Sequence, residues 1–184
     1  MKANKWYLIG FIGMVLLQWL VPGRMILQSE GDLDKGTQYK FLVSPIDPND
    51  PFRGKYLTLN YQANTVQGEF LESYGKGSPV FVSIREDASG FAEAYRVSHL
   101  KPEDTSDFTE ARVTGIQPFE GGTKITFSYP FRKYYVNEKK ASEIEKAFQQ
   151  AAGENDFDTY AIVRVRNGRG LLEDLVINGT PVRE

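Results

Sequence analysis

Basic and aromatic side chains stand together at two places in the sequence, each within or just after a Pro-Phe-Arg run. The first place carries Arg53, Lys55 and Tyr56, and the second carries Arg132 and Tyr134. A guanidinium beside an aromatic ring suits a carboxylate or phosphate, because its planar fork of N–H donors matches two oxygens. If the two runs face each other, these five residues form a ligand-binding cleft for an anion. The alternative is that each arginine pairs locally and each ring packs in the core.

Composition removes many other kinds of chemistry. The 184 residues include no cysteine, which excludes a thiolate nucleophile, a disulfide scaffold, a lipid-modified cysteine and a sulfur-based zinc site. His99 is the single histidine, and it is expected in an exposed loop. The sequence has no dinucleotide fingerprint and no Gly-rich phosphate loop, so we expect no cofactor and no metal. The net charge of −2 gives no reason to expect a nucleic-acid partner.

Hydrolysis remains the rival class of function. Ser44, Ser73, Ser78 and Ser83 are available for a Ser-Lys dyad, but none lies in a recognisable nucleophile setting. Paired carboxylates for glycoside hydrolysis cannot be located by spacing alone. The sequence therefore predicts no catalytic residues and favours binding over catalysis.

The N-terminal segment is suited to a lipid bilayer. From residue 6 to residue 23 it carries no charge and is rich in large apolar side chains. A helix rising about 1.5 Å per residue over this run approaches the roughly 30 Å of a bilayer's hydrocarbon core. Trp6, Tyr7 and Trp19 lie near the two ends, where headgroups favour amphipathic aromatics. We expect a cytoplasmic N-terminus and transmembrane anchor over residues 1–28 and a linker over residues 29–38.

The flanking charges suggest an orientation. Lys2 and Lys5 precede the apolar run, acidic residues follow at positions 30–34, and Arg24 alone opposes this bias. The positive-inside rule then favours a single-pass protein of the cytoplasmic membrane, with its C-terminal domain outside the cytoplasm. A cleaved signal peptide is the alternative. The apolar run is longer than the apolar h-region of a usual signal peptide, however, and no A-x-A cleavage motif follows it.

Alternation of apolar and polar residues dominates the rest of the chain. This period of two is typical of half-buried strands, and residues 87–90 and 167–170 are typical of hairpin turns. We therefore expect a mainly β domain, a β-sandwich or barrel-like fold, over residues 39–184. The alternating runs cover residues 39–43, 57–61, 80–84, 113–115, 125–129, 161–165 and 175–177.

One amphipathic helix and one internal repeat are also expected. Asn137 can cap a helix that Gly153 can end, with an apolar face that includes Ile144 and Phe148. Residues 39–98 and 123–178 form a candidate repeat with a period of about 80 residues, because the Pro-Phe-Arg run and a following hairpin recur in each. Chance likeness between alternating strands is the alternative.

Residues 45–61 read PIDPNDPFRGKYLTLNY and resemble the signature of the GDYxxLxY family. Gly54, Tyr56, Leu59 and Tyr61 fall at the named positions, whereas Lys55 replaces the acid, so any role of that acid cannot be transferred. The resemblance extends over nearly the whole chain. It implies a bacterial membrane-anchored protein of uncharacterised activity, often encoded beside multi-pass membrane proteins, and it implies no reaction.

The signature also has a structural interpretation. Asp47 and Asp50 precede prolines, which keep them out of the α region, and their carboxylates can cap turn amides. They lack the pattern of a calcium loop. Gly54 permits a backbone conformation that other residues avoid, and Leu59 and Tyr61 share one strand face. We expect these five residues to form a structural corner.

Taken together, the sequence predicts a membrane-anchored envelope protein that works as a non-catalytic binding module. Its expected partners are the lipid bilayer, through the N-terminal helix, and either a multi-pass membrane protein or a small anionic or glycan ligand. An envelope-surface hydrolase using carboxylates or a Ser-Lys dyad is the alternative.

Overall fold

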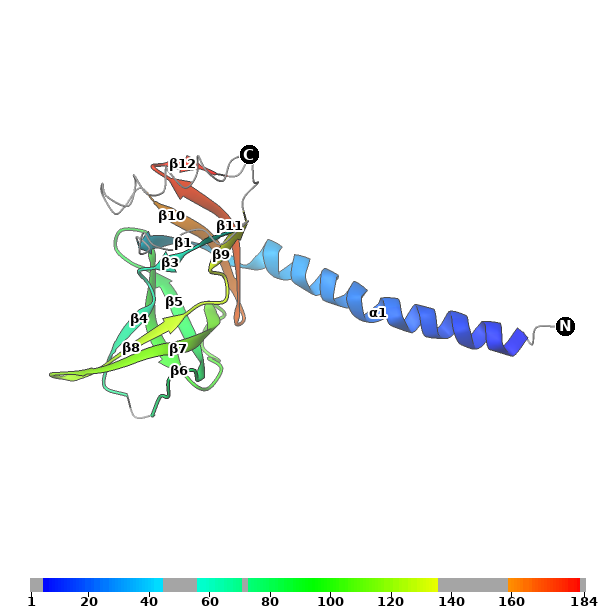
Figure 1. Ribbon diagram of the computed structural model, residues 1–184, viewed down its shortest axis with the longest axis horizontal. Helices are drawn as coiled ribbons and strands as arrows, with labels where there is room; N and C mark the ends of the chain where they lie inside the picture. The colour runs from blue at the N-terminus through cyan, green and yellow to red at the C-terminus, as the bar shows by residue number, and fades with distance from the viewer. Residues whose placement is uncertain (1–4, 45–55, 71–72, 136–158, 183–184) are drawn as a thin grey trace. The chain divides into compact units, whose positions relative to one another are not determined.

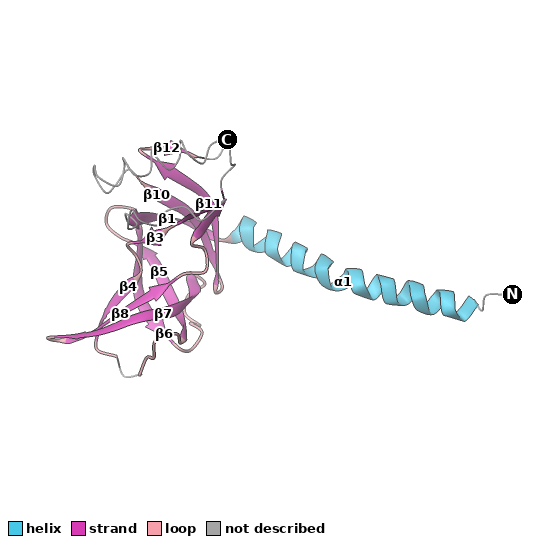
Figure 2. Cartoon of the chain, viewed as in Figure 1, coloured by secondary structure: helices cyan, strands magenta, loops and turns pink. Residues whose placement is uncertain are grey.

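The computed structural model describes residues 5–44, 56–70, 73–135 and 159–182. The chain divides into two compact units, Met1–Gly36 and Thr37–Glu184. Figure 2 shows that the described part of the first unit is helical and that the described elements of the second are strands.

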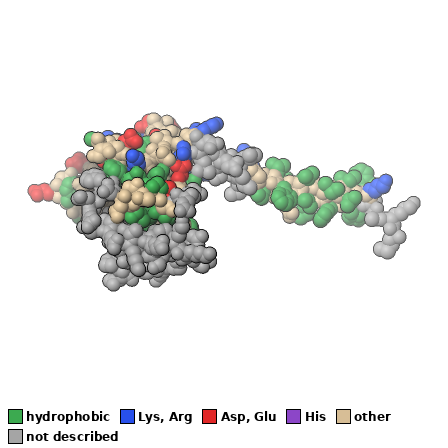
Figure 3. Space-filling model, turned by 90° about the horizontal axis from the view of Figure 1, so that it is seen from above, with side chains coloured by type: hydrophobic (Ala, Val, Ile, Leu, Met, Phe, Trp, Pro, Cys, Tyr) green, Lys and Arg blue, Asp and Glu red, His purple; other side chains and the backbone are tan. Residues whose placement is uncertain are grey.

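The first unit is the helix α1, Lys5–Lys35, with Pro22 inside it. Its segment Lys5–Arg24 is long and apolar enough to cross a membrane by length and composition. Apolar side chains cover the visible face of this segment (Figure 3). The helix continues to Lys35, so most of the segment predicted as a linker over residues 29–38 is helical, and strand β1 begins at Thr37. Gly36 follows its last residue, where glycine commonly ends a helix.

The second unit contains twelve described strands. Two five-stranded sheets have the orders β12-β11-β10-β1-β3 and β4-β8-β7-β5-β6, and β2 and β9 form a two-stranded ribbon. Neighbouring strands are antiparallel throughout. The strands are β1 Thr37–Ser44, β2 Tyr56–Thr58, β3 Asn60–Tyr61, β4 Thr65–Gly68, β5 Pro79–Glu86, β6 Ala92–Ser98, β7 Phe108–Phe119, β8 Gly122–Ser128, β9 Lys133–Tyr135, β10 Tyr160–Arg166, β11 Arg169–Ile177 and β12 Thr180–Pro181.

Together the sheets form a nearly closed, barrel-like arrangement (Figure 1). The start of β7 reaches the turn between β10 and β11, where Glu110 N donates to Gly168 O and Gly168 N donates to Phe108 O, both at 2.9 Å. Asn167 and Gly168 have φ values of 48° and 89°, which suit the left-handed positions of a two-residue hairpin turn. The hairpin predicted at residues 167–170 is therefore one place where the two large sheets meet.

Aromatic rings fill the centre of the second unit. The Phe41 ring meets the rings of Tyr61, Tyr129 and Phe131 edge-on at 5.3–5.6 Å, and Tyr129 stacks on Phe131 at 4.9 Å. Such offset and edge-on contacts favour a specific packing beyond burial alone. Tyr61 donates its hydroxyl to Phe131 O at 2.7 Å, so its polar atom is satisfied inside the core.

The β-dominated fold class and the long apolar N-terminal helix are confirmed. The helix expected between Asn137 and Gly153 lies outside the described residues. The repeat of residues 39–98 and 123–178 stays a prediction. The pairing of β2 with β9 agrees with the repeat. If Tyr56 corresponds to Tyr134 and Leu57 to Tyr135, the pair Tyr56–Tyr135 becomes the pair Tyr134–Leu57, and both pairs occur in the ribbon. The sheet order does not agree with the repeat. The repeat matches β1 to β8 and β5 to β10, so the direct pairing of β1 with β10 would require β8 to pair with β5, whereas β7 lies between those two strands.

Candidate functional site

The strands that follow the two Pro-Phe-Arg runs pair with each other. β2 and β9 are antiparallel, with Tyr56 opposite Tyr135, Leu57 opposite Tyr134, and Thr58 opposite Lys133. Because side chains alternate along a strand, this register places Tyr56, Lys133 and Tyr135 on one face of the ribbon. We call these three residues the ribbon face.

The ribbon face is open to solvent and cationic. The Tyr56 and Tyr135 rings lie 5.8 Å apart, and the Lys133 ammonium lies 4.5 Å from the centre of the Tyr56 ring. The Tyr135 side chain is 70% exposed. No carboxylate within the described ranges pairs with Lys133, whose one recorded contact is with the ring. A cation over an aromatic face keeps its charge available to an anion on its other side.

The opposite side of the ribbon packs inward. Leu57 is fully buried, and Tyr134 packs against the core and donates its hydroxyl to Asp174 Oδ1 at 3.2 Å. The predicted ligand residue Tyr134 is therefore half-buried, on the side of the ribbon opposite Tyr56.

Arg132 also makes local contacts. Its Nε donates to Leu59 O at 3.4 Å and its Nη1 donates to Ser128 Oγ at 3.1 Å, while Leu59 N donates to Arg132 O at 2.7 Å. These bonds link Ser128 of β8, and Arg132 just before β9, to Leu59 of the signature. The geometry assigns this guanidinium to the corner itself, so that Lys133 is the available cation among the residues of this corner that the structure describes.

A hollow of about 250 Å³ adjoins the ribbon face. It is lined by Lys133, Tyr134, Tyr135, Leu172 and Glu173. Glu173 accepts hydrogen bonds from Arg164 Nε at 2.7 Å and from Gln38 Nε2 at 2.8 Å, which fixes its carboxylate at the border. The hollow thus combines a cation, two tyrosines and a fixed acceptor.

The remaining predicted site residues divide into two groups. Leu59 and Tyr61 lie in the core with exposed fractions of 0% and 2%. Burial raises the pKa of the Tyr61 hydroxyl far above its usual value, and the nearby Arg132 charge opposes this only in part. Arg53, Lys55, Asp47, Asp50 and Gly54 lie outside the described residues.

The described surroundings of His99 and Ser83 do not support the rival function of a hydrolase. His99 is exposed at the end of β6 and stacks on Tyr74 at 4.7 Å. Ser83 is buried and its Oγ accepts from Arg96 rather than from a lysine. No group of three or more metal-ligating side chains occurs within the described ranges.

Sequence reasoning did not place Lys133 and Tyr135 together on one strand face. Alternation within Lys133–Tyr135 could have separated these two side chains from Tyr134. Their meeting with Tyr56 could not have been found locally, because it depends on a pairing across more than seventy residues.

The described elements define the class of protein: a small barrel-like β unit preceded by a helix long and apolar enough to span a membrane. The chain belongs to the GDYXXLXY family, since the model described as "GDYXXLXY protein" matches residues 18–175. The match begins within α1 and ends within β11, so it includes the ribbon face, and it confirms the resemblance drawn from residues 45–61. No curated protein and no solved structure matches the chain.

Proposed function

We propose that this protein is a membrane-anchored envelope module that binds an anionic ligand at the ribbon face. One observation carries the proposal: Lys133 lies over the Tyr56 ring, beside the exposed Tyr135, without a carboxylate partner in the described ranges. An ammonium in this position attracts an anion, and exposed tyrosines supply both flat apolar surface and hydroxyl groups. An acidic sugar offers the matching combination of carboxylate, hydroxyls and apolar C–H face.

The anchor belongs to the same proposal. α1 supplies the required length, and Lys2 and Lys5 on its N-terminal side favour a cytoplasmic N-terminus with the β unit outside. Tethering raises the local concentration of any ligand or multi-pass protein in the same membrane, so a modest intrinsic affinity is sufficient.

Titration of the full-length protein with an acidic trisaccharide tests the ligand class. The protein is held in zwitterionic detergent without sugar headgroups, trigalacturonate is the probe, and calorimetry measures the dissociation constant. Lys133→Ala and Tyr135→Ala should each weaken binding by about tenfold, the equivalent of about 1.4 kcal/mol. Added salt should weaken binding to the unaltered protein as well, because exposed charges are screened.

Lys76→Ala is the matched control, since Lys76 is an exposed lysine in a loop distant in sequence from the ribbon. It should leave the affinity unchanged. Equal losses from Lys76→Ala and Lys133→Ala would reduce the effect to net charge and contradict a site. Inorganic phosphate as a second probe separates simple anion binding from recognition of the sugar ring.

A further inference from the structure

A second hollow lies where the barrel fails to close. Among the strands that the structure describes, β4 and β6 are the two edges of their sheet, because β4 pairs only with β8 and β6 only with β5. Beside this seam lies a hollow of about 550 Å³, bordered by residues of β4, β5 and β6 and by Leu42 of β1. Ligand pockets commonly measure about 300–1,000 Å³, so the space suits a small molecule.

The floor of this seam hollow is apolar and is made of small side chains. Ala92 and Ala94 of β6 and Val66 of β4 are buried there, and Ala63 lies beside them. Larger residues at the alanine positions would fill the space. The floor therefore offers a shallow apolar surface with nothing for a charged group to bind.

Tyr95 also lines the hollow, and it lies at a β-bulge of β6. Ser83 pairs with Arg96 and Ile84 with Ala94, so Tyr95 is the extra residue of β6 at that point. Bulges redirect side chains and are frequent beside functional sites. The guanidiniums of Arg85 and Arg96 lie 5.2 Å and 5.7 Å from the centre of the Tyr95 ring.

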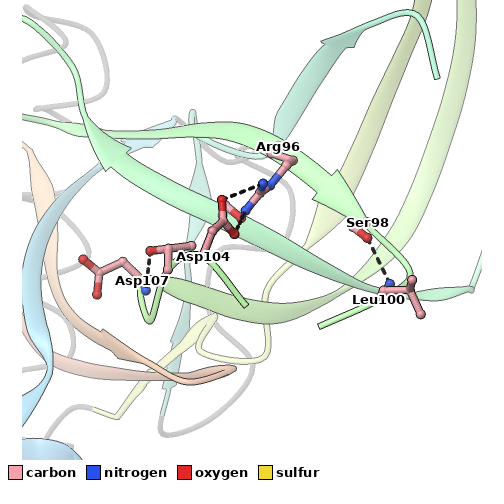
Figure 4. A network of polar contacts seen from close by, with 7 residues as sticks. Arg96, Ser98, Leu100, Asp104 and Asp107 are labelled. Atoms are coloured by element: carbon pink, nitrogen blue, oxygen red, sulfur yellow. Dashed lines mark hydrogen bonds and ion pairs between the residues drawn. The ribbon is translucent and has the colours of Figure 1, made fainter. Parts of the chain in front are cut away.

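Both guanidiniums are themselves fixed. Arg85 Nε donates to Glu93 at 2.7 Å, and Arg96 donates to the two carboxylate oxygens of Asp104 at 2.6 Å and 2.9 Å (Figure 4). The ring thus has a defined position before any ligand arrives, which lowers the entropy cost of binding.

The rim is polar but its charges are already satisfied. Arg85 is paired with Glu93, and Asp87 accepts the backbone N–H groups of Ser89 and Phe91 at 2.8 Å and 2.9 Å. The other polar side chains of the rim are neutral. The amide side chains of Gln62 and Gln67 and the hydroxyl of Thr65 line the hollow, and no side-chain hydrogen bond is recorded for them within the described ranges.

We propose that the seam hollow binds a neutral saccharide. Amides and hydroxyls act as both donors and acceptors, which sugar hydroxyls require, while the fixed Tyr95 ring and the alanine floor match the apolar face of a sugar. An added peptide strand does not fit between the two edges. Cα atoms of β4 and β6 approach within 8 Å, whereas a strand between them needs about 9.5 Å, twice the strand spacing.

Neutral trisaccharides test this site in the full-length protein, again in zwitterionic detergent. Maltotriose and chitotriose are the probes, read by saturation-transfer NMR and by calorimetry. Binding of at least one of them at millimolar concentration is expected. Tyr95→Ala should weaken it by at least about tenfold, as for an aromatic anchor.

Gln67→Ala guards against misfolding of the Tyr95 variant, because Gln67 is exposed and has no recorded side-chain bond. It should weaken binding severalfold, and the exposed amide variant Gln117→Ala on β7 should not. Lys133→Ala should also have no effect, which separates this site from the ribbon face. Absence of binding by both sugars, or binding that survives Tyr95→Ala and Gln67→Ala, would overturn the proposal, as would binding of trigalacturonate that depends on Tyr95.

Discussion

Gly170 determines how closely the ring of Phe131 approaches the β10–β11 hairpin. This glycine lies in β11 opposite Val165. A Cβ atom built on it would lie 2.2 Å and 2.3 Å from Cε1 and Cδ1 of Phe131, much closer than non-bonded carbons allow. The ring cannot easily move away, because it stacks on Tyr129 and meets Phe41. Close packing thus requires the absence of a side chain here.

Gly170→Ala should therefore lower the free energy of unfolding by about 1–3 kcal/mol, the usual cost of overpacking a core. Chemical denaturation followed by circular dichroism gives the value. Gly68→Ala is the matched control, since its Cβ would meet nothing nearer than Phe70 Cζ at 4.0 Å. Equal stability of the two variants would show that the Phe131 ring relaxes without cost.

Three tyrosines with raised pKa values make the second unit sensitive to base. Burial raises the pKa of Tyr61 and of Tyr129, and burial together with the hydrogen bond to Asp107 raises that of Tyr39. The Tyr39 hydroxyl donates to Asp107 Oδ2 at 3.0 Å. Since the unfolded chain ionises near pH 10, these groups contribute stability that is fully present below about pH 10 and is lost as the pH rises toward their folded-state values.

Alkaline unfolding should consequently begin above about pH 10, with a slope of up to roughly 1.4 kcal/mol per pH unit for each buried tyrosine. Tyrosinate absorbance and circular dichroism, recorded together, check this. The absorbance of the buried set should appear only as the β signal disappears. Tyr61→Phe should flatten the pH dependence, and full ionisation of the tyrosines before unfolding would contradict the prediction.

At the scale of elements, α1 is longer than the anchor that the sequence predicts. The segment from residue 29 to residue 36 resembles a linker in composition because it combines acids with glycines. Residues 29–35 nevertheless continue the helix, and Lys35 in the last turn interacts favourably with the helix dipole. Composition therefore gave the apolar segment correctly, but it did not show that the helix continues to Lys35.

The membrane insertion proposed for α1 predicts how the full chain fractionates. It should remain in the membrane pellet after alkaline carbonate washing, because about 20 apolar residues insert almost irreversibly. Protease added outside the cytoplasmic membrane should remove the β unit and leave the helix. A soluble mature form beginning near Arg24 would instead show that the segment is a cleaved signal.

The whole molecule shows which features local sequence can supply. Period-two alternation predicted most of the strands, because one face of each is buried. It missed β4, β9 and β12, which are only two to four residues long and too short to show a period. It also gave no alternating run for β6, in which the bulge at Tyr95 interrupts the period. Long-range pairing was also hidden. The ribbon face depends on the register of β2 with β9, and the seam hollow on two edges that remain unpaired, and neither can be inferred from neighbouring residues.

The position of β1 has a consequence for the order of folding. This strand follows the helix directly, yet its partner over residues 37–42 is β10, where Thr37 lies opposite Val165. Pairings across such a sequence separation form slowly, since the intervening loop must close first. A chain that emerges N-terminus first therefore holds residues 37–42 of β1 without their partner strand until about residue 165 has appeared. The sheet that contains β1 can therefore form only late, and a chaperone that covers exposed strands would have its main opportunity to act before that step.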